Sequence, residues 1–412
     1  MAKMPSFEPS AVHSRSAQIK ATAAITVLVL FCISAYSLFG HQIIREIYDG
    51  GAASIFQKKL SESRALEFYL GKADRIIYAY GALLFAACLT ALTFLSRLGN
   101  KPREHDLIAD IALFSMYCAI GYIYFMLFGY EGEWYRLETI LSLQGAPPFQ
   151  HRVLFIGVAH LALWVWPNLS TVEAFLASQM IALMLALWSV RLLCSVFLRK
   201  DLAFAGQFLM LAAWAPTVSY YTLYDLGIIA IYAIALYLIF TDRFKHYLIV
   251  LALGTYNHEI TLFLIVAFAL ISFDRIPKRR LITLLITQLL IYALVRWSLF
   301  SALPAEAAWE GGKVAKNMAM VLQDPARVIS NLGWTALLFA AALATLAATP
   351  TLLRRSVIVL PCLMFMTFVV GQLNEARQFD AFIPIFAALI CAWIGRAIHD
   401  KTAAGSGHPA VR

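Results

Sequence analysis

Long apolar runs, separated by short polar segments, fill most of this chain of 412 residues. A helix needs about 20 apolar residues to cross a bilayer. The chain is 61% hydrophobic and only 14% charged, whereas soluble domains are about 45–50% apolar and about 25% charged. The sequence therefore predicts an all-α, polytopic membrane protein with about 10–12 transmembrane helices and excludes a soluble enzyme. The expected apolar spans are 21–39, 76–96, 107–130, 172–198, 202–219, 226–241, 281–301, 329–348, 356–372 and 380–396.

Two further apolar stretches do not fit a single crossing. The run 247–273 is interrupted by Gly254-Thr-Tyr-Asn-His-Glu259, which predicts two short helices that meet at a polar tip. The stretch from Val153 to Trp166 has only 14 residues before Pro167. That length favours a re-entrant or interfacial helix over a full crossing.

The distribution of basic residues predicts the orientation, because Lys and Arg accumulate on the cytoplasmic side of membrane proteins. With both termini cytoplasmic and 153–166 not crossing, the inner segments are rich in Lys and Arg. The net charge of +9 is thereby explained without a nucleic-acid partner. The predicted organisation is a cytoplasmic tail at 1–20, one transmembrane domain at 21–396 with external loops 40–75, 131–171 and 302–328, and a cytoplasmic tail at 397–412.

Acidic, histidine and amide residues collect on the opposite, external side. Glu131 and Glu133 lie at a helix end beside Trp134. They are either part of a solvated acidic loop, or one of them is a general base whose pKa is raised by a neighbouring charge and apolar walls.

Glu259 lies between two apolar half-helices, where a carboxylate needs a partner, an aqueous cavity or a proton. This makes it a functional candidate, although Asn257, His258 and Glu259 could together simply cap a helix. With His151, the His258-Glu259 pair offers only a weak metal site, so we expect no resident metal or other cofactor.

Tyr224 and Asp225 close a tyrosine-rich segment. Aromatic rings beside a carboxylate suit a sugar or another polyol, but an interfacial tyrosine belt has the same pattern.

Three arginines lie at external helix ends or within spans: Arg152, Arg296 and Arg377. The planar guanidinium suits bidentate recognition of phosphate. Each arginine could instead pair with a carboxylate such as Glu375, near Gln378, or extend to the membrane interface.

This layout resembles the GT-C superfamily of integral-membrane glycosyltransferases. The resemblance rests on the acidic and aromatic segment Glu131–Arg136 followed by Pro148-Phe-Gln-His-Arg-Val-Leu154, on Tyr224-Asp225, on Asn257-His-Glu-Ile-Thr261, and on Glu375-Ala-Arg377 with Pro384.

The resemblance implies transfer of a sugar from a polyprenyl-phosphate carrier to an envelope glycan or glycolipid, on the periplasmic face of an inner membrane. It implies Glu133 or Glu131 as catalytic base, and Arg377 with Arg152 or Arg296 as a phosphate clamp. The acid usual in the family follows the first span, so Asp49 and Asp74 of loop 40–75 are alternatives for the base. The implied substrate-binding residues are His151, Arg152, Tyr224, Asp225, Asn257, His258, Glu259, Arg296, Glu375, Arg377 and Gln378.

Three other classes remain open. A polysaccharide polymerase or O-antigen ligase has a similar number of spans, but usually one long catalytic loop. A secondary transporter or flippase is favoured by the break at 254–259. A non-catalytic subunit of an envelope-assembly complex would use the polar cluster as an interface.

Overall fold

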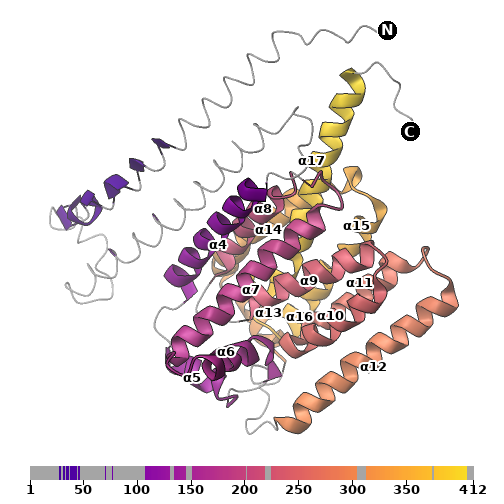
Figure 1. Cartoon of the computed structure of the whole chain (residues 1–412), viewed down its shortest axis with the longest axis horizontal. Coiled ribbons are helices and arrows are strands. Elements are labelled where there is room, and N and C mark those ends of the chain that lie inside the picture. Colours follow the sequence, from indigo (N-terminus) through magenta and orange to yellow (C-terminus); the bar gives the residue numbers. More distant parts are fainter. Residues whose placement is uncertain are drawn as a thin grey trace. The chain divides into compact units, whose positions relative to one another are not determined.

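The computed structural model describes residues 107–129, 134–144, 151–200, 202–218, 224–303, 312–373 and 375–405, and isolated positions between 27 and 77. Every regular element in these ranges is a helix (Figure 1). The chain divides into two units, 1–112 with 123–128 and 113–122 with 129–412. All the described candidate site residues belong to the second unit.

The elements are α4 (Leu107–Gly129), α5 (Trp134–Leu141), α6 (Leu154–Val165), α7 (Thr171–Cys194), α8 (Ala205–Trp214), η3 (Ala215–Thr217), α9 (Asp225–Phe240), α10 (Phe244–Asn257), η4 (Glu259–Thr261), α11 (Leu262–Ser272), α12 (Lys278–Ala302), α13 (Val314–Gln323), α14 (Pro325–Leu343), η5 (Leu346–Ala348), α15 (Thr351–Ser356), α16 (Val359–Val369), η6 (Ala376–Phe382) and α17 (Ile383–Gly405).

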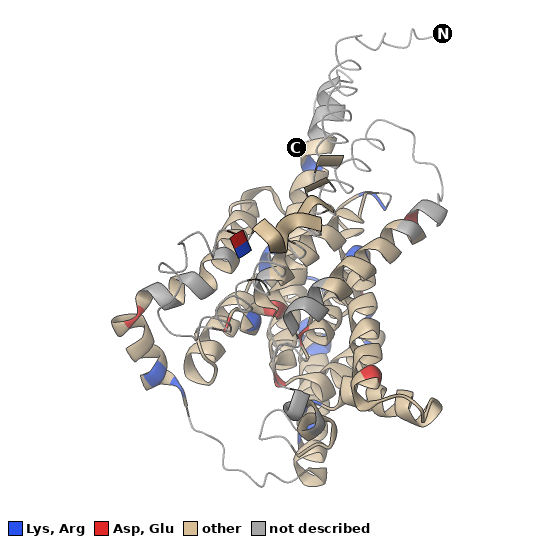
Figure 2. Cartoon of the chain, turned by 90° about the vertical axis from the view of Figure 1, so that its left-hand side faces the viewer, with Lys and Arg blue, Asp and Glu red and all other residues tan. Residues whose placement is uncertain are grey.

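Helix length and composition agree with an all-α, polytopic membrane protein. Among the described residues, four helical segments are long and apolar enough to cross a membrane, and further apolar helices have 10–17 residues. Uncharged residues make up most of the described helices (Figure 2). The four long segments are Thr171–Cys194, Lys278–Ala302, Thr351–Val369 and Ala376–Ile398.

The predicted interruption of the run 247–273 is confirmed, because α10 ends at Asn257 and α11 begins at Leu262. Helix α6 has 12 residues and rises about 18 Å, less than the hydrocarbon core of about 30 Å. The run 202–219 is not one helix: α8 ends at Trp214, where Pro216 lacks the N–H donor that an α-helix needs.

The segments expected as loops and tails contain helices. The expected external loop 131–171 holds α5 in addition to α6, which corresponds to the short helix predicted at 153–166, and 302–328 holds α13. Helix α17 continues to Gly405, into the expected tail 397–412. Residues 1–20 lie outside the described part of the chain.

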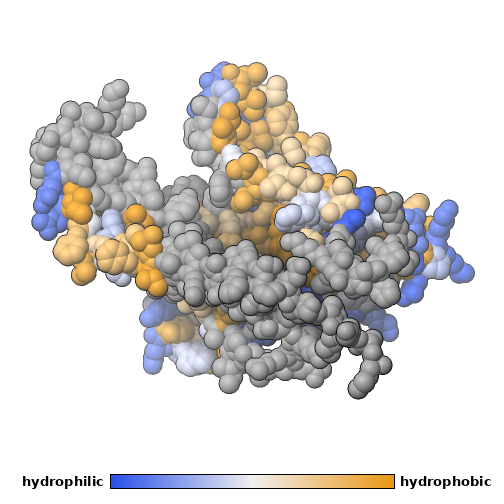
Figure 3. Space-filling view, turned by 90° about the horizontal axis from the view of Figure 1, so that it is seen from above, coloured by the Kyte–Doolittle hydropathy of each residue, from blue (hydrophilic) through white to orange (hydrophobic). Residues whose placement is uncertain are grey.

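Helices α7 and α9 lie side by side at the centre of the second unit, with α6, α8 and α17 against α7 (Figure 1). Helix α9 is apolar on every face and is buried along nearly its whole length, as expected of such a helix inside a bundle. Helix α12 has the opposite character, because its apolar residues Ile286, Leu290, Leu294 and Trp297 are exposed. Apolar residues are also visible at the surface of the described part of the chain in Figure 3.

Basic residues stabilise the end of the unit at which α9 finishes. Arg275 donates hydrogen bonds to the carbonyl oxygens of Ile239 and Phe240 and to the Asp242 carboxylate. A cation at a helix C-terminus is favoured by the helix dipole. Arg355 pairs with Asp274 nearby. Asp225 lies at the other end of α9, 16 residues or about 24 Å away along the helix.

Gly395 allows α17 to approach the chain just after α7. A Cβ atom at this position would lie 2.5 Å from the backbone oxygen of Phe197. We expect Gly395→Ala to lower the free energy of unfolding by about 1–3 kcal/mol, because the backbone must move. Gly157→Ala is the matched control, since nothing lies within 4 Å of its added Cβ. Equal stability of the two variants in detergent unfolding curves would contradict this close approach.

Candidate functional site

The break between α10 and α11 places a carboxylate against a buried arginine. An Arg152 Nη2 donates to Glu259 Oε1 at 2.7 Å, and its Nε to Oε2 at 3.4 Å. Arg152 is only 5% exposed. Its guanidinium also lies 5.3 Å from the ring centroid of Tyr224, within range of a cation–π interaction. Glu259 therefore has the partner that a carboxylate at this depth requires.

Hydrogen bonds from three other segments hold the break in place. Tyr292 on α12 donates to the backbone oxygen of Glu259 at 3.0 Å, and Tyr232 on α9 to that of Ile260 at 2.5 Å. The Val153 N–H donates to the Tyr256 oxygen at 2.8 Å. Helix termini leave backbone groups without partners inside the helix. Here tyrosine hydroxyls and a neighbouring chain segment satisfy them.

His258 is a neutral member of this cluster. Burial lowers its pKa to about 3, and the charge of Arg152 contributes to the shift. Its Nδ1 accepts a hydrogen bond from the Ile260 N–H at 3.3 Å, which puts the ring proton on Nε2. The His258 ring lies 3.5 Å from Glu259 Oε2, but the neutral ring adds no positive charge to Glu259.

A second acid–arginine group lies at the start of α9. Arg377 is buried, with Nη2 2.9 Å from Glu375 Oε2 and Nη1 4.0 Å from Asp225 Oδ2. Gln378 also donates to Glu375 Oε2 at 2.9 Å. Arg152 and Arg377 each pair with a carboxylate, which was one of the two alternatives that the sequence left open for these arginines.

Asn257 connects the two groups, because its Nδ2 donates to the Tyr224 backbone oxygen at 3.3 Å. The close packing depends on Gly227, where a Cβ atom would lie 2.4 Å from Phe155 and 2.9 Å from Asn257 Oδ1.

Arg296 differs from the other two arginines. Its guanidinium carbon lies 5.0 Å from the ring centroid of Phe300, and it acts electrostatically on His258. It is half-buried. Among the described residues, its Nη1 has no hydrogen-bond partner. This guanidinium can therefore still donate to an anion.

His151 lies against the same phenylalanine. Its ring meets Phe300 edge-on at 4.4 Å between centroids, and its Nε2 lies 2.9 Å from the Leu303 backbone oxygen. His151 is fully buried, so its contacts fix the start of α6 against the end of α12.

Asp380 is a site residue that the sequence interpretation missed. It is 1% exposed and interacts electrostatically with Asp225 and Arg377. An acid at the first position of the apolar run 380–396 was a usable signal, because ionisable residues in membrane segments are costly.

The structure thus brings the eleven predicted substrate-binding residues into one connected region. We call this region the polar cluster; it comprises His151, Arg152, Tyr224, Asp225, Asn257, His258, Glu259, Arg296, Glu375, Arg377 and Gln378, with Asp380 added. The predicted bases Glu131 and Glu133, and the alternatives Asp49 and Asp74, lie outside the described residues. In the described part of the chain, no group of three or more His, Cys, Asp or Glu residues is arranged to hold a metal ion.

The polar cluster offers two distinct chemical capacities. Asp225 Oδ2 is buried and accepts no hydrogen bond within the described residues, so it can take a proton from a ligand hydroxyl. Arg296 can bind an anionic oxygen. Glu259 and Glu375 are already engaged by arginine.

Comparison with protein-family models, with curated proteins and with solved structures finds no match to this chain.

Proposed function

We propose that this protein is a multi-pass inner-membrane glycosyltransferase of the GT-C type. It transfers a sugar from a polyprenyl-phosphate carrier to an envelope glycan or glycolipid on the periplasmic face. The basic end, with Arg275 and Arg355, faces the cytoplasm in this proposal, as positive charge does in membrane proteins generally. The polar cluster then faces the periplasm.

The observation that carries the proposal is the available guanidinium of Arg296 beside a cluster whose other arginines are paired. A polyprenyl phosphate presents an anionic head on an apolar tail. Arg296 binds the phosphate oxygens, while the exposed apolar residues of α12, such as Leu290 and Leu294, contact the polyprenyl chain. Arg152 and Arg377 hold their carboxylates in position and add positive potential.

In the reaction, a carboxylate takes the proton of the acceptor hydroxyl. The acceptor oxygen forms a bond to the anomeric carbon as the bond from that carbon to the phosphate oxygen breaks. The electron pair leaves with the polyprenyl phosphate, whose charge the arginine stabilises. Asp225 is the described carboxylate suited to this step, and Glu131 and Glu133 remain predictions for it.

We expect Arg296→Gln to weaken the binding of undecaprenyl phosphate by about 10- to 100-fold, because hydrogen bonds to a charged group contribute about 1.5–3 kcal/mol. The measurement is a titration of the protein in phosphatidylcholine nanodiscs, read by native mass spectrometry.

The matched control is Arg355→Gln, which removes the same charge at the opposite end and should leave binding unchanged. Undecaprenol, which lacks the phosphate, should bind wild type and Arg296→Gln equally. Unchanged binding of undecaprenyl phosphate to Arg296→Gln would remove the main support for the transferase.

A second candidate function is secondary transport. It is favoured by two buried acids, Asp225 at the start of α9 and Asp380 in η6, the short helix between α16 and α17. Broken helices with charges at a buried site are typical of secondary transporters. Solute uptake into proteoliposomes that is lost in Asp380→Asn, without any binding of undecaprenyl phosphate, would favour transport.

A further inference from the structure

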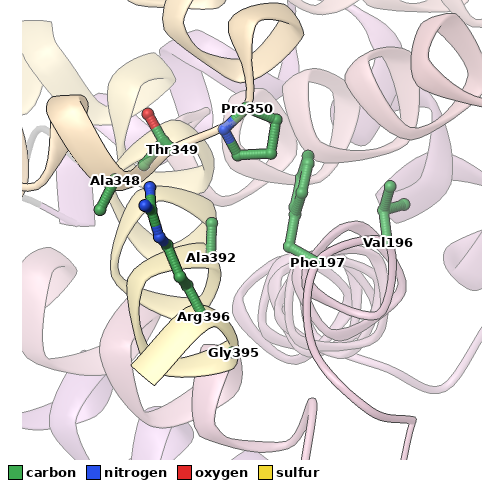
Figure 4. A pocket seen from close by; sticks show the side chains of 8 residues that line it. All are labelled: Val196, Phe197, Ala348, Thr349, Pro350, Ala392, Gly395 and Arg396. Carbon is green, nitrogen blue, oxygen red and sulfur yellow. The ribbon is translucent and has the colours of Figure 1, made fainter. Parts of the chain in front are cut away.

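A cavity of about 480 Å³ lies at the basic end, far from the polar cluster. Its walls come from the chain just after α7, the turn between η5 and α15, and α17. In Figure 4, the Arg396 side chain extends from α17 toward Ala348 and Thr349, while Phe197 and Pro350 lie across the cavity. Apart from Arg396 and Thr349, the lining side chains are apolar.

The walls of this cavity are fixed by contacts of the backbone. Arg354 donates to the Thr349 backbone oxygen at 3.1 Å, and the Thr349 hydroxyl donates to the Leu346 oxygen at 2.9 Å. The close approach of Gly395 to the Phe197 carbonyl forms the junction of α7 and α17. The shape of the cavity is therefore set by the packing of the bundle, and Arg396 lies at its edge.

An apolar path leads from the cavity along the outside of α7. Ile181, Met184, Leu185 and Trp188 are 39–50% exposed, and their spacing of three and four residues puts them on one helical face. Val196, in the turn that follows α7, is 39% exposed and lines the cavity. An acyl chain that lies on this face of α7 would place the headgroup of its lipid in the cavity.

We propose that this cavity binds the headgroup of an anionic phospholipid, with Arg396 contacting the phosphate and one acyl chain lying along α7. The occupant follows from charge and shape. An anionic phosphate matches the single arginine, an acyl chain matches the apolar walls, and basic pockets between helices on the cytoplasmic side are typical sites for such lipids. This site does not depend on the transferase reaction, but it rests on the orientation proposed above, in which the basic end faces the cytoplasm.

The test is a titration of purified protein with phosphatidylglycerol in detergent, followed by native mass spectrometry. We expect one tightly retained lipid in wild type and at least a tenfold loss of affinity in Arg396→Gln. Arg355→Gln is the matched control, because Arg355 belongs to the same basic end but does not line the cavity. Ala348→Phe should also displace the lipid, by filling the cavity without changing charge.

The outcomes separate the alternatives. Loss of the lipid in Arg396→Gln and Ala348→Phe, but not in Arg355→Gln, supports the site. Equal losses in the two arginine variants would mean general attraction of anionic lipid to the basic end and would overturn it. So would retention of phosphatidylcholine as strongly as phosphatidylglycerol, or binding of inorganic phosphate alone with equal sensitivity to Arg396→Gln.

Discussion

Glu259→Gln should lower the free energy of unfolding by about 3 kcal/mol or more, the largest effect that we expect from a single substitution. Removing one partner of a buried ion pair costs about 3–5 kcal/mol, because the other charge stays buried without compensation. Here that charge is Arg152, which is 5% exposed and 2.7 Å from Glu259. The measurement is an equilibrium unfolding curve in mild detergent, with helix content as the signal.

The double variant Arg152→Gln and Glu259→Gln should recover part of this loss, since neither charge then remains alone. Asp274→Asn is the matched control. It breaks an ion pair with Arg355 in which the Asp274 side chain is 59% exposed, and exposed pairs contribute at most about 1 kcal/mol. Similar losses for Glu259→Gln and Asp274→Asn would show that the Arg152–Glu259 pair is as well hydrated as a surface pair.

Asn317→Leu should be the second most damaging change, with a loss of about 2–3 kcal/mol. Asn317 on α13 is fully buried, and its Nδ2 donates to the carbonyl oxygens of Thr367, Phe368 and Gly371 at 2.8–3.2 Å. These carbonyls lie at the end of α16, where partners within the helix are missing. Leaving buried polar groups without partners costs about 1–3 kcal/mol.

The same residue also positions the polar cluster. The Leu373 N–H donates to Asn317 Oδ1 at 3.1 Å, only a few residues before Arg377. We therefore expect Asn317→Leu to reduce ligand binding at the cluster even where the protein remains folded. Lys316→Ala, at an exposed position on the same helix, should change stability by less than about 0.5 kcal/mol. Equal stability of the two variants would exclude Asn317 as the support of this segment.

Much of the fold was predictable from the sequence, because long apolar runs in a bilayer form helices that satisfy their own backbone hydrogen bonds. The break within 247–273 is a clear example, since the polar residues Asn257, His258 and Glu259 interrupt an otherwise apolar run. The apolar pattern alone did not predict two features. It did not predict that the helix in the run 202–219 ends before Pro216, or that the polar stretch 302–328 contains α13.

The residues of the polar cluster, apart from Asp380, could be selected from the sequence, but the contacts between them could not. Buried charges in an apolar chain are conspicuous, so Arg152 and Glu259 could be selected individually. They lie 107 positions apart, and nothing local distinguishes Glu259 from Glu375 as the partner of Arg152. The same reason explains why the Arg296 Nη1, which has no hydrogen-bond partner among the described residues, was identified only in the structure.

The pairing of Asp225 with Arg377 also sets an order of events during biosynthesis. These residues are separated by about 150 positions, and synthesis adds about 5–20 residues per second, so roughly 8–30 seconds pass before Arg377 exists. Asp225 must spend this interval protonated or in contact with water, because an unpaired carboxylate is costly in lipid. Asp225 therefore reaches its final position beside Arg377 only after η6 has been synthesised.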